Sequence, residues 1–287
     1  MYAAGKAGPP EDPRPALIRA LPGSMSEARN RLARNPGDEA GLHRLRVSLK
    51  RMRSLWRLSR PLHAGNEPDR ERQSLGKSAQ KLSAARNRHV ILGLLAELLE
   101  AGKPDSPAGP NLRPETQGAA TGALGILEVS LLKFLSFPLL QEGEGPWGKS
   151  LIQAYRRARN RMPASADEED EAFHRWRKAV KDLLYALESW PGKSRKRRSR
   201  WIGKLDLLQD RLGKTHDFSV LESILTGSAS KRRSNAPLSR REIPQGKARK
   251  QALLRAAREK RNWKRKGLAF GRKLFEPPPR KFRHRLL

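Results

Sequence analysis

The chain has 287 residues, of which 61 are Lys or Arg and 29 are Asp or Glu, so its formal net charge at pH 7 is +32. A charge excess of this size indicates a polyanionic partner: a phosphate polymer, a nucleic acid or an anionic lipid surface. The absence of cysteine excludes disulfide bonds and thiolate metal sites, and a hydrophobic content of only 37% predicts extended segments beside the folded part.

The N-terminal residues 1–23 are rich in Pro and Gly and are predicted to be disordered. They lack the apolar stretch of a signal peptide, which favours a cytoplasmic location. Residues 24–275 are predicted to form a helical domain, because Leu, Ala, Arg, Lys and Glu predominate and no run alternates between apolar and polar residues. Residues 276–287 are a basic tail, and its three prolines exclude a regular helix through them.

Helical periodicity recurs along the whole domain. The predicted helices cover residues 24–34, 38–60, 68–100, 119–136, 148–162, 168–190, 197–213, 217–225 and 247–274. Loops are predicted where Pro, Gly and Ser accumulate, in residues 101–117, 142–148 and 226–250. The longest apolar stretch, residues 123–140, contains Glu128, Lys133 and Pro138. It therefore favours a core helix over a membrane span.

Two segments of the chain resemble each other at an offset of 131 residues. Both begin with His-Arg-apolar-Arg and continue to a Lys four residues later; the first runs from His43 to Lys50 and the second from His174 to Lys181. A similar Leu-containing segment follows each of them further along the chain. We predict an internal repeat of two sets of helices, residues 24–140 and 148–275, related by a pseudo-twofold axis.

In both copies a basic stripe runs along the helix directly beside an apolar one. The basic stripes consist of His43, Arg46, Lys50, Arg53 and Arg57, and of His174, Arg177 and Lys181. Because the apolar stripe packs on the core, the basic one is expected at the rim of the packed surface. Like charges at these spacings cost about 0.2–0.5 kcal/mol per pair. An anion would offset that repulsion; the alternative is a solvated basic face without a ligand.

The pattern His-x-x-Arg-x-x-x-Lys on two helices, followed by Arg86-Asn87-x-x-Val in the first copy and His216-Asp217-x-x-Val in the second, resembles the CHAD domain, the conserved histidine α-helical domain. The resemblance spans roughly residues 24–275. It implies two pseudo-twofold-related helical bundles with a basic central cleft. It also implies binding of inorganic polyphosphate and, in bacteria, association with polyphosphate granules.

By motif, the resemblance implies a set of ligand-facing residues. They are His43, Arg46, Lys50, Arg53, His174, Arg177 and Lys181, with Arg44, Arg51, Arg57, Arg86 and Lys178 as secondary candidates. Asn87 stands where the family usually carries Asp, so no carboxylate is expected to act there in the first copy. His43 and His174 either donate to phosphate when protonated or have a structural role.

The chemistry of the stripes suits polyphosphate, which carries about one negative charge per phosphate and presents no bases, so its receptor needs dense Arg and Lys donors. Aromatic residues make up only 6% of the chain, which leaves few platforms for stacking nucleobases. A protein that binds nucleic acid without sequence preference, or takes it as a weaker polyanion, remains the alternative. Its basic residues would line a groove wide enough for a duplex.

No catalytic, metal or cofactor site is predicted. The sequence contains no GxxxxGK[ST] phosphate loop, no HExxH pair and no Glu-x-Glu-x-Lys of the triphosphatase domain that often accompanies the CHAD domain. An unrecognised phosphohydrolase would need carboxylates near the motif helices, where the sequence offers Asp182 and Glu188. The chain is therefore interpreted as a non-catalytic, cytoplasmic binding protein of unknown oligomeric state, and the resemblance implies that it associates with polyphosphate granules.

Overall fold

The computed structural model describes residues 16–35, 38–99, 114–136, 144–189, 195–227 and 243–286. Within these ranges the regular structure is helical throughout, which confirms the all-α prediction. The helices are α1 (Ala16–Arg34), α2 (Glu39–Ser59), the short 3-10 turn η1 (Arg60–Leu62), α3 (Glu67–Lys81), α4 (Ser83–Leu99), α5 (Pro114–Ser136), α6 (Glu144–Asn160), α7 (Asp170–Ser189), α8 (Arg195–Thr226), α9 (Gly246–Phe275) and α10 (Pro279–Leu286).

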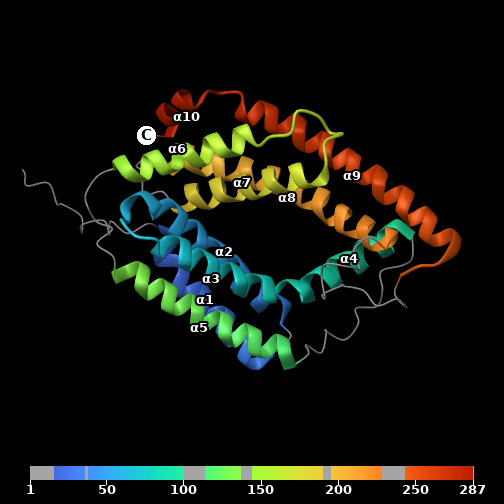
Figure 1. The fold of residues 1–287 in the computed structure, drawn as a ribbon, viewed down its shortest axis with the longest axis horizontal. Helices are drawn as coiled ribbons and strands as arrows, with labels where there is room; N and C mark the ends of the chain where they lie inside the picture. The colour runs from blue at the N-terminus through green and yellow to red at the C-terminus, as the bar shows by residue number, and fades with distance from the viewer. Residues whose placement is uncertain are drawn as a thin grey trace, which may run out of the picture.

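Two groups of helices lie side by side (Figure 1). Helices α1, α2, α3 and α5 pack against one another in the first group, and α6, α7, α8 and α9 follow one another in the second. Helices α2 and α7, which carry the two sequence motifs, contact each other where the groups meet. The repeated motif therefore lies at the centre of the molecule.

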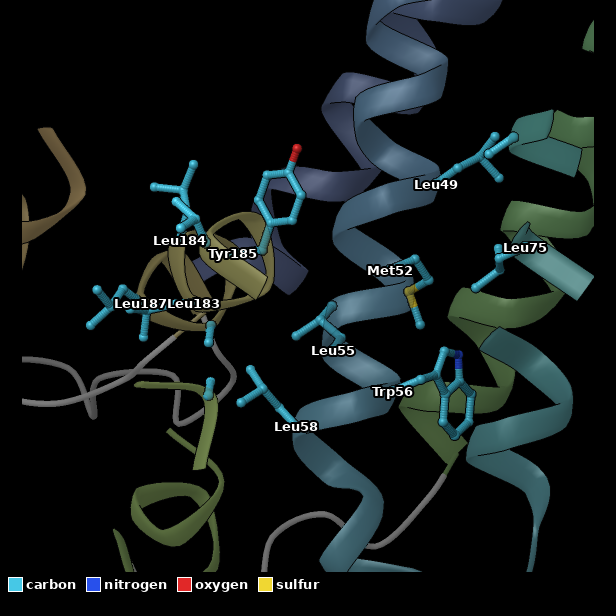
Figure 2. Close-up of a cluster of buried hydrophobic side chains, with 14 of the residues drawn as sticks. Leu49, Met52, Leu55, Trp56, Leu58, Leu75, Leu183, Leu184, Tyr185 and Leu187 are labelled. Carbon is cyan, nitrogen blue, oxygen red and sulfur yellow. The ribbon is translucent and has the colours of Figure 1, made fainter. Parts of the chain in front are cut away.

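The large core forms around α2 (Figure 2). Leu55 and Leu58 of α2 point toward α7, whereas Met52 and Trp56 point toward α3 and α5. The indole Nε1 of the fully buried Trp56 donates a 2.8 Å hydrogen bond to Ser130 Oγ of α5. Because α2 is apolar toward both neighbours, the basic stripe is left as a narrow strip between its two packed faces.

A smaller core joins the two groups through α4. Its residues come from α4 (Ile91, Leu94, Leu95 and Leu98), from α8 (Phe218, Leu221, Ile224 and Leu225) and from α9 (Ala252 and Ala256). Helix α4 thus leaves the group of α3 and packs on the far ends of α8 and α9, as Figure 1 shows. Burial of this apolar surface holds the first part of the chain against the second.

Both ends of the chain are more ordered than predicted. The predicted disordered segment 1–23 is too long, because α1 begins at Ala16 and buries Ile18 and Leu21 in the core. The predicted tail 276–287 contains α10, which starts at the third proline, where a missing N–H is tolerated in a first helical turn. Its Phe282 is fully buried and stacks on Tyr155 of α6, with ring centroids 4.0 Å apart.

Two helix boundaries also differ from the prediction. The segment 68–100 is interrupted at Leu82, where Arg46 Nη1 donates to the freed Leu82 carbonyl at 2.5 Å. Conversely, 197–213 and 217–225 form one continuous helix, α8. Helix α6 begins at Glu144, inside the predicted loop 142–148. Most of the other two predicted loops lies outside the described residues, although α5 begins at Pro114 and α9 at Gly246.

Among the described helices, α5 is long and apolar enough over Gln117–Ser136 to cross a membrane by those two criteria alone. Part of it is nevertheless core, since Leu127 and Phe134 are fully buried against the rest of the first group. The central helix of a folded domain passes the same test, so the observation is weak support for a span.

Candidate polyanion-binding site

The two apolar stripes of the motif helices are buried as predicted. They comprise Leu42, Leu45, Leu49, Met52 and Trp56 of α2, and Phe173, Trp176, Val180, Leu183 and Leu187 of α7. The basic stripes beside them lie at the rim of the packed surface, which confirms their predicted position. His43 is exposed and Arg46 is buried, whereas Lys50, Arg53, Arg57, His174, Arg177 and Lys181 are half-buried.

Each motif helix is held at its N-terminus by an acidic residue. Asp38 caps α2 by accepting a 2.7 Å hydrogen bond from Gly41 N. Asp170 starts α7 and accepts from Ser219 Oγ of α8 at 2.6 Å and from Lys260 and Lys264 of α9 at 2.9 and 2.8 Å. Burial raises the pKa of Asp170, but these three donors outweigh it and lower that pKa to about 2. The start of α7 is thereby fixed to both neighbouring helices.

Five guanidinium groups gather near the C-terminal half of α2. We call this group the arginine cluster: Arg53 and Arg57 of α2, Arg72 of α3, Arg157 of α6 and Arg161 directly after α6. Burial lowers the pKa of Arg57 to about 9, with further lowering by Arg72, Arg157, Arg53 and Arg161. Burial also lowers the pKa of Arg53 and Arg157, and neighbouring arginines add to both shifts.

The arginine cluster is short of acceptors. The Nε atoms of Arg53, Arg72 and Arg157 are buried without a hydrogen-bond partner among the described residues. Asp182 forms an ion pair with Arg57, and Asp69 with Arg72 at 2.7 Å. Among the described residues, two carboxylates thus pair with members of a cluster of five cations, and buried donors without acceptors are rare unless a ligand or water supplies them.

Space for one of these guanidinium groups is provided by α3. A Cβ atom at Gly76 would lie 3.3 Å from Arg53 Cζ, so glycine at this position lets the Arg53 side chain lie flat between α2 and α3. In the second copy, a Cβ atom at Gly213 of α8 would lie in ordinary van der Waals contact with an arginine of α7, 3.8 Å from Arg177 Nη2. His174 stacks on His216 of α8, with ring centroids 4.9 Å apart and the planes tilted by 28°.

Two ion pairs join α2 directly to α7. Arg51 donates to both carboxylate oxygens of Glu188, at 3.0 and 3.2 Å, and Arg57 pairs with Asp182. At the repeat offset of 131 residues, positions 51 and 57 of α2 correspond to positions 182 and 188 of α7. Each pair therefore connects one position to the counterpart of the other. Contacts exchanged in this manner are those that a twofold axis between two helices produces.

The remaining predicted residues are placed differently. Arg44 is exposed and pairs with Glu27 of α1 at 2.9 Å, while Lys178 is exposed on α7. Arg51 serves the contact between the motif helices rather than the arginine cluster. The side chain of Arg86 lies outside the described residues.

The sequence analysis did not single out Arg72, Arg157 or Arg161. They lie outside the motif helices, on α3, on α6 and directly after α6, and join the arginine cluster only through packing. The density of arginine between positions 156 and 161 is the one signal that points to part of this set. In the part of the chain that the structure describes, no group of three or more His, Asp or Glu side chains is arranged to hold a metal ion.

The sequence model of the CHAD domain matches residues 23–226, and the chain therefore belongs to the CHAD domain family. The fold is similar to the crystal structure of the CHAD domain from the plant Ricinus communis, with a TM-score of 0.57 over 92% of this chain and 97% of that chain. Sequence identity to that domain is 21%, so the likeness concerns the fold. No curated protein matches the chain.

Proposed function

We propose that this protein is a non-catalytic receptor for inorganic polyphosphate, which binds along the basic stripes of α2 and α7. Binding of polyphosphate is a known property of the family to which the chain belongs. The observation that carries the proposal for this chain is the arginine cluster, in which the buried Nε atoms of Arg53, Arg72 and Arg157 have no hydrogen-bond partner among the described residues.

The energetics of the arginine cluster favour an anionic ligand. A pKa of about 9 for Arg57 means that the folded protein holds this side chain charged at a free-energy penalty. Phosphate oxygens placed among the five groups would accept the unused hydrogen bonds and remove part of the repulsion. Arginine suits this role because its planar fork can donate two parallel hydrogen bonds to one phosphate.

The same features favour polyphosphate over nucleic acid. A polyphosphate chain is thin and carries no bases, so it can reach guanidinium groups that are half-buried between helices. The two tryptophans of the motif helices, Trp56 and Trp176, are fully buried and offer no stacking surface to bases. Nucleic acid would then bind as a weaker polyanion through exposed cations.

We further propose that the two stripes face a common basic cleft across the pseudo-twofold axis. The exchanged ion pairs Arg51–Glu188 and Arg57–Asp182 support such an axis. A cytoplasmic location on polyphosphate granules forms part of the same proposal and rests on the family relationship.

The test is a titration of polyphosphate across a salt series, with duplex DNA and single-stranded RNA as competitors. The variant Arg53→Met/Arg157→Met removes two clustered charges whose side chains form no ion pair within the described residues. Its matched control, Arg258→Met/Arg261→Met, removes two exposed charges from α9 and changes the net charge equally. We expect the first variant to weaken polyphosphate binding about tenfold or more, because charge-assisted hydrogen bonds are lost.

Three results would count against the proposal. Equal weakening in both variants would mean that net charge alone drives binding. DNA that competes as well as polyphosphate would favour the nucleic-acid alternative. Hydrolysis of polyphosphate by the purified protein would contradict a non-catalytic role. A thermal unfolding curve of each variant establishes that it is folded.

A further inference from the structure

Helix α5 has a second apolar face on the side opposite the core. Its buried residues include Ala123, Leu127 and Phe134. About 180° around the helix from Leu127 runs a second row, which we call the outer stripe: Gly118, Gly122, Gly125, Val129, Leu132 and Ser136, all exposed. Val129 and Leu132 are 54% and 67% exposed, and Ile126 and Leu135 flank them at 37% and 41%. These four are most of the large hydrophobic side chains that the described residues expose.

The outer stripe carries no charge on a protein whose net charge is +32. Between residues 117 and 136 the two charged side chains both pair within the molecule: Glu128 with Arg29 of α1, and Lys133 with Glu67 and Glu71 of α3. Helix α9, in the second group, exposes mainly cations instead. They include Arg258, Arg261, Arg265, Lys266, Arg272 and Lys273. An apolar outer face is therefore a property of α5 and not a general feature of the outer helices.

The spacing along the outer stripe is that of a coiled-coil seam. Successive members are separated by four, three, four, three and four residues, which is the alternation of a and d positions in a heptad repeat. The stripe is also graded in size, with glycines in its first half and larger residues in its second. A Cβ atom added at Gly118, Gly122 or Gly125 would meet nothing within 4 Å, so this half has open space for the side chains of a partner.

Such a graded stripe is complementary to itself when a second copy runs antiparallel. Layers that pair an a position with a d position then place Gly118 opposite Ser136, Gly122 opposite Leu132 and Gly125 opposite Val129. Every layer joins one glycine to one larger residue. A parallel arrangement would instead place glycine against glycine and leucine against leucine, leaving gaps at one end and crowding at the other.

A pocket adjoins the glycine half of the outer stripe. It has a volume of about 420 Å³, lies between α1 and α5, and is lined by Leu32, Ala120, Thr121, Leu124 and Gly125 among others. Gly125 lines this pocket, so in the antiparallel arrangement Val129 of the second copy, which faces Gly125, would lie beside it. The twofold axis would place Val129 of the first copy beside the same pocket of the second copy.

We propose that the outer stripe of α5 is a homodimer interface, in which two copies of the chain pack their α5 helices antiparallel around a twofold axis. The interface lies on a helix that carries none of the arginine cluster, so the proposal is independent of the ligand. It assigns an occupant to the one long apolar face that the described structure leaves uncovered.

The first experiment is sedimentation velocity over a range of protein concentrations, in high salt and without polyphosphate or nucleic acid. We expect a species of twice the chain mass of 32.4 kDa. Gly122→Leu adds a bulky side chain to the outer stripe at a position that has open space in the single chain, and Leu132→Glu places a charge in the stripe. Each should weaken dimerisation about tenfold or more. The matched control is Leu254→Glu, because Leu254 is a 65% exposed leucine on α9; it should leave the dimer unchanged.

The second experiment uses the absence of native cysteine. The variant Gly122→Cys/Leu132→Cys should form an intermolecular disulfide under mild oxidation. Its two thiols lie about 15 Å apart along one helix and cannot join within a chain. The single variant Gly122→Cys should not cross-link, because position 122 faces position 132 of the second copy. Cross-linking by Gly122→Cys alone would indicate parallel packing and overturn the proposal.

Two further results would also overturn it. One is a chain that sediments as a monomer at every concentration. The other is binding of the unaltered protein to vesicles of neutral phospholipid that the Leu132→Glu variant loses. The outer stripe would then contact lipid instead of a second copy.

Discussion

At the scale of single residues, the buried charges of the arginine cluster favour ligand binding but lower the stability of the free protein. Burial lowers the pKa of Arg57 from its ordinary value to about 9, so folding disfavours the charged form. That penalty is fully present below pH 9 and is relieved only as the pH rises from there toward the pKa of the unfolded chain. Asp182 compensates Arg57 in part, whereas Arg53 has no carboxylate partner among the described residues. Arg53 is thus the clearest place to separate the two effects.

We predict that Arg53→Met stabilises the free protein by about 1 kcal/mol and weakens polyphosphate binding. Methionine keeps the unbranched side chain in contact with α3 but removes a desolvated charge, and partial solvent exposure limits the gain. Thermal unfolding with and without polyphosphate measures both effects. The comparison is Arg57→Met, which should destabilise the protein, because it leaves Asp182 without its partner. A lower midpoint for ligand-free Arg53→Met would contradict this interpretation.

At the scale of helices, the second group depends on a close approach of α9 to α7. A Cβ atom at Gly271 would lie 2.6 and 2.7 Å from the ring of Trp176 and 3.3 Å from Met162 Sδ. Trp176 is fully buried in the apolar stripe of α7 and cannot move aside without disturbing the core. Glycine at position 271 therefore sets how near α9 lies to the motif helix.

Gly271→Ala should destabilise the protein by about 1–3 kcal/mol, the range for overpacked cores. Gly203→Ala in α8 is the matched control, because a Cβ atom there meets nothing within 4 Å. It should be neutral or stabilising by up to about 1 kcal/mol through helix propensity. Denaturant unfolding of the two variants compares them directly. Equal effects would mean that the contact with Trp176 is unimportant.

Asp170 fixes the start of α7 to α8 and α9, and its contribution should depend on pH. Its pKa in the folded protein is lowered to about 2, so the stabilisation is present above the ordinary value of 3.8 and is lost as the pH falls through 2. Asp170→Asn should lower the free energy of unfolding at neutral pH by about 1–2 kcal/mol, allowing for screening at a partly exposed carboxylate. The difference from the natural protein should shrink between pH 4 and 2. Glu169→Gln, at the exposed neighbouring position, should show no such convergence.

At the scale of the whole molecule, the sequence predicted those features that depend only on residues a few positions apart on one helix. The two apolar stripes are buried, and the basic stripes lie at their rim, because residues three and four apart share a helix face whatever packs against it. The chain ends and helix breaks were predicted less well. Where these helices begin and end depends on residues from elsewhere in the chain. Tyr155 stacks on Phe282 of α10, and Arg46 donates a hydrogen bond to the carbonyl of Leu82, where the helix is interrupted.

The sequence by itself thus determined the helical class, the two motif helices, the family and the strongly cationic character of this protein. Only the tertiary structure brought Arg72, Arg157 and Arg161 to Arg53 and Arg57, paired Arg51 with Glu188, and left the outer stripe of α5 uncovered. The physical reason is that helix periodicity relates residues a few positions apart. Charges and surfaces contributed by different helices become neighbours only when burial of the shared core sets how those helices pack.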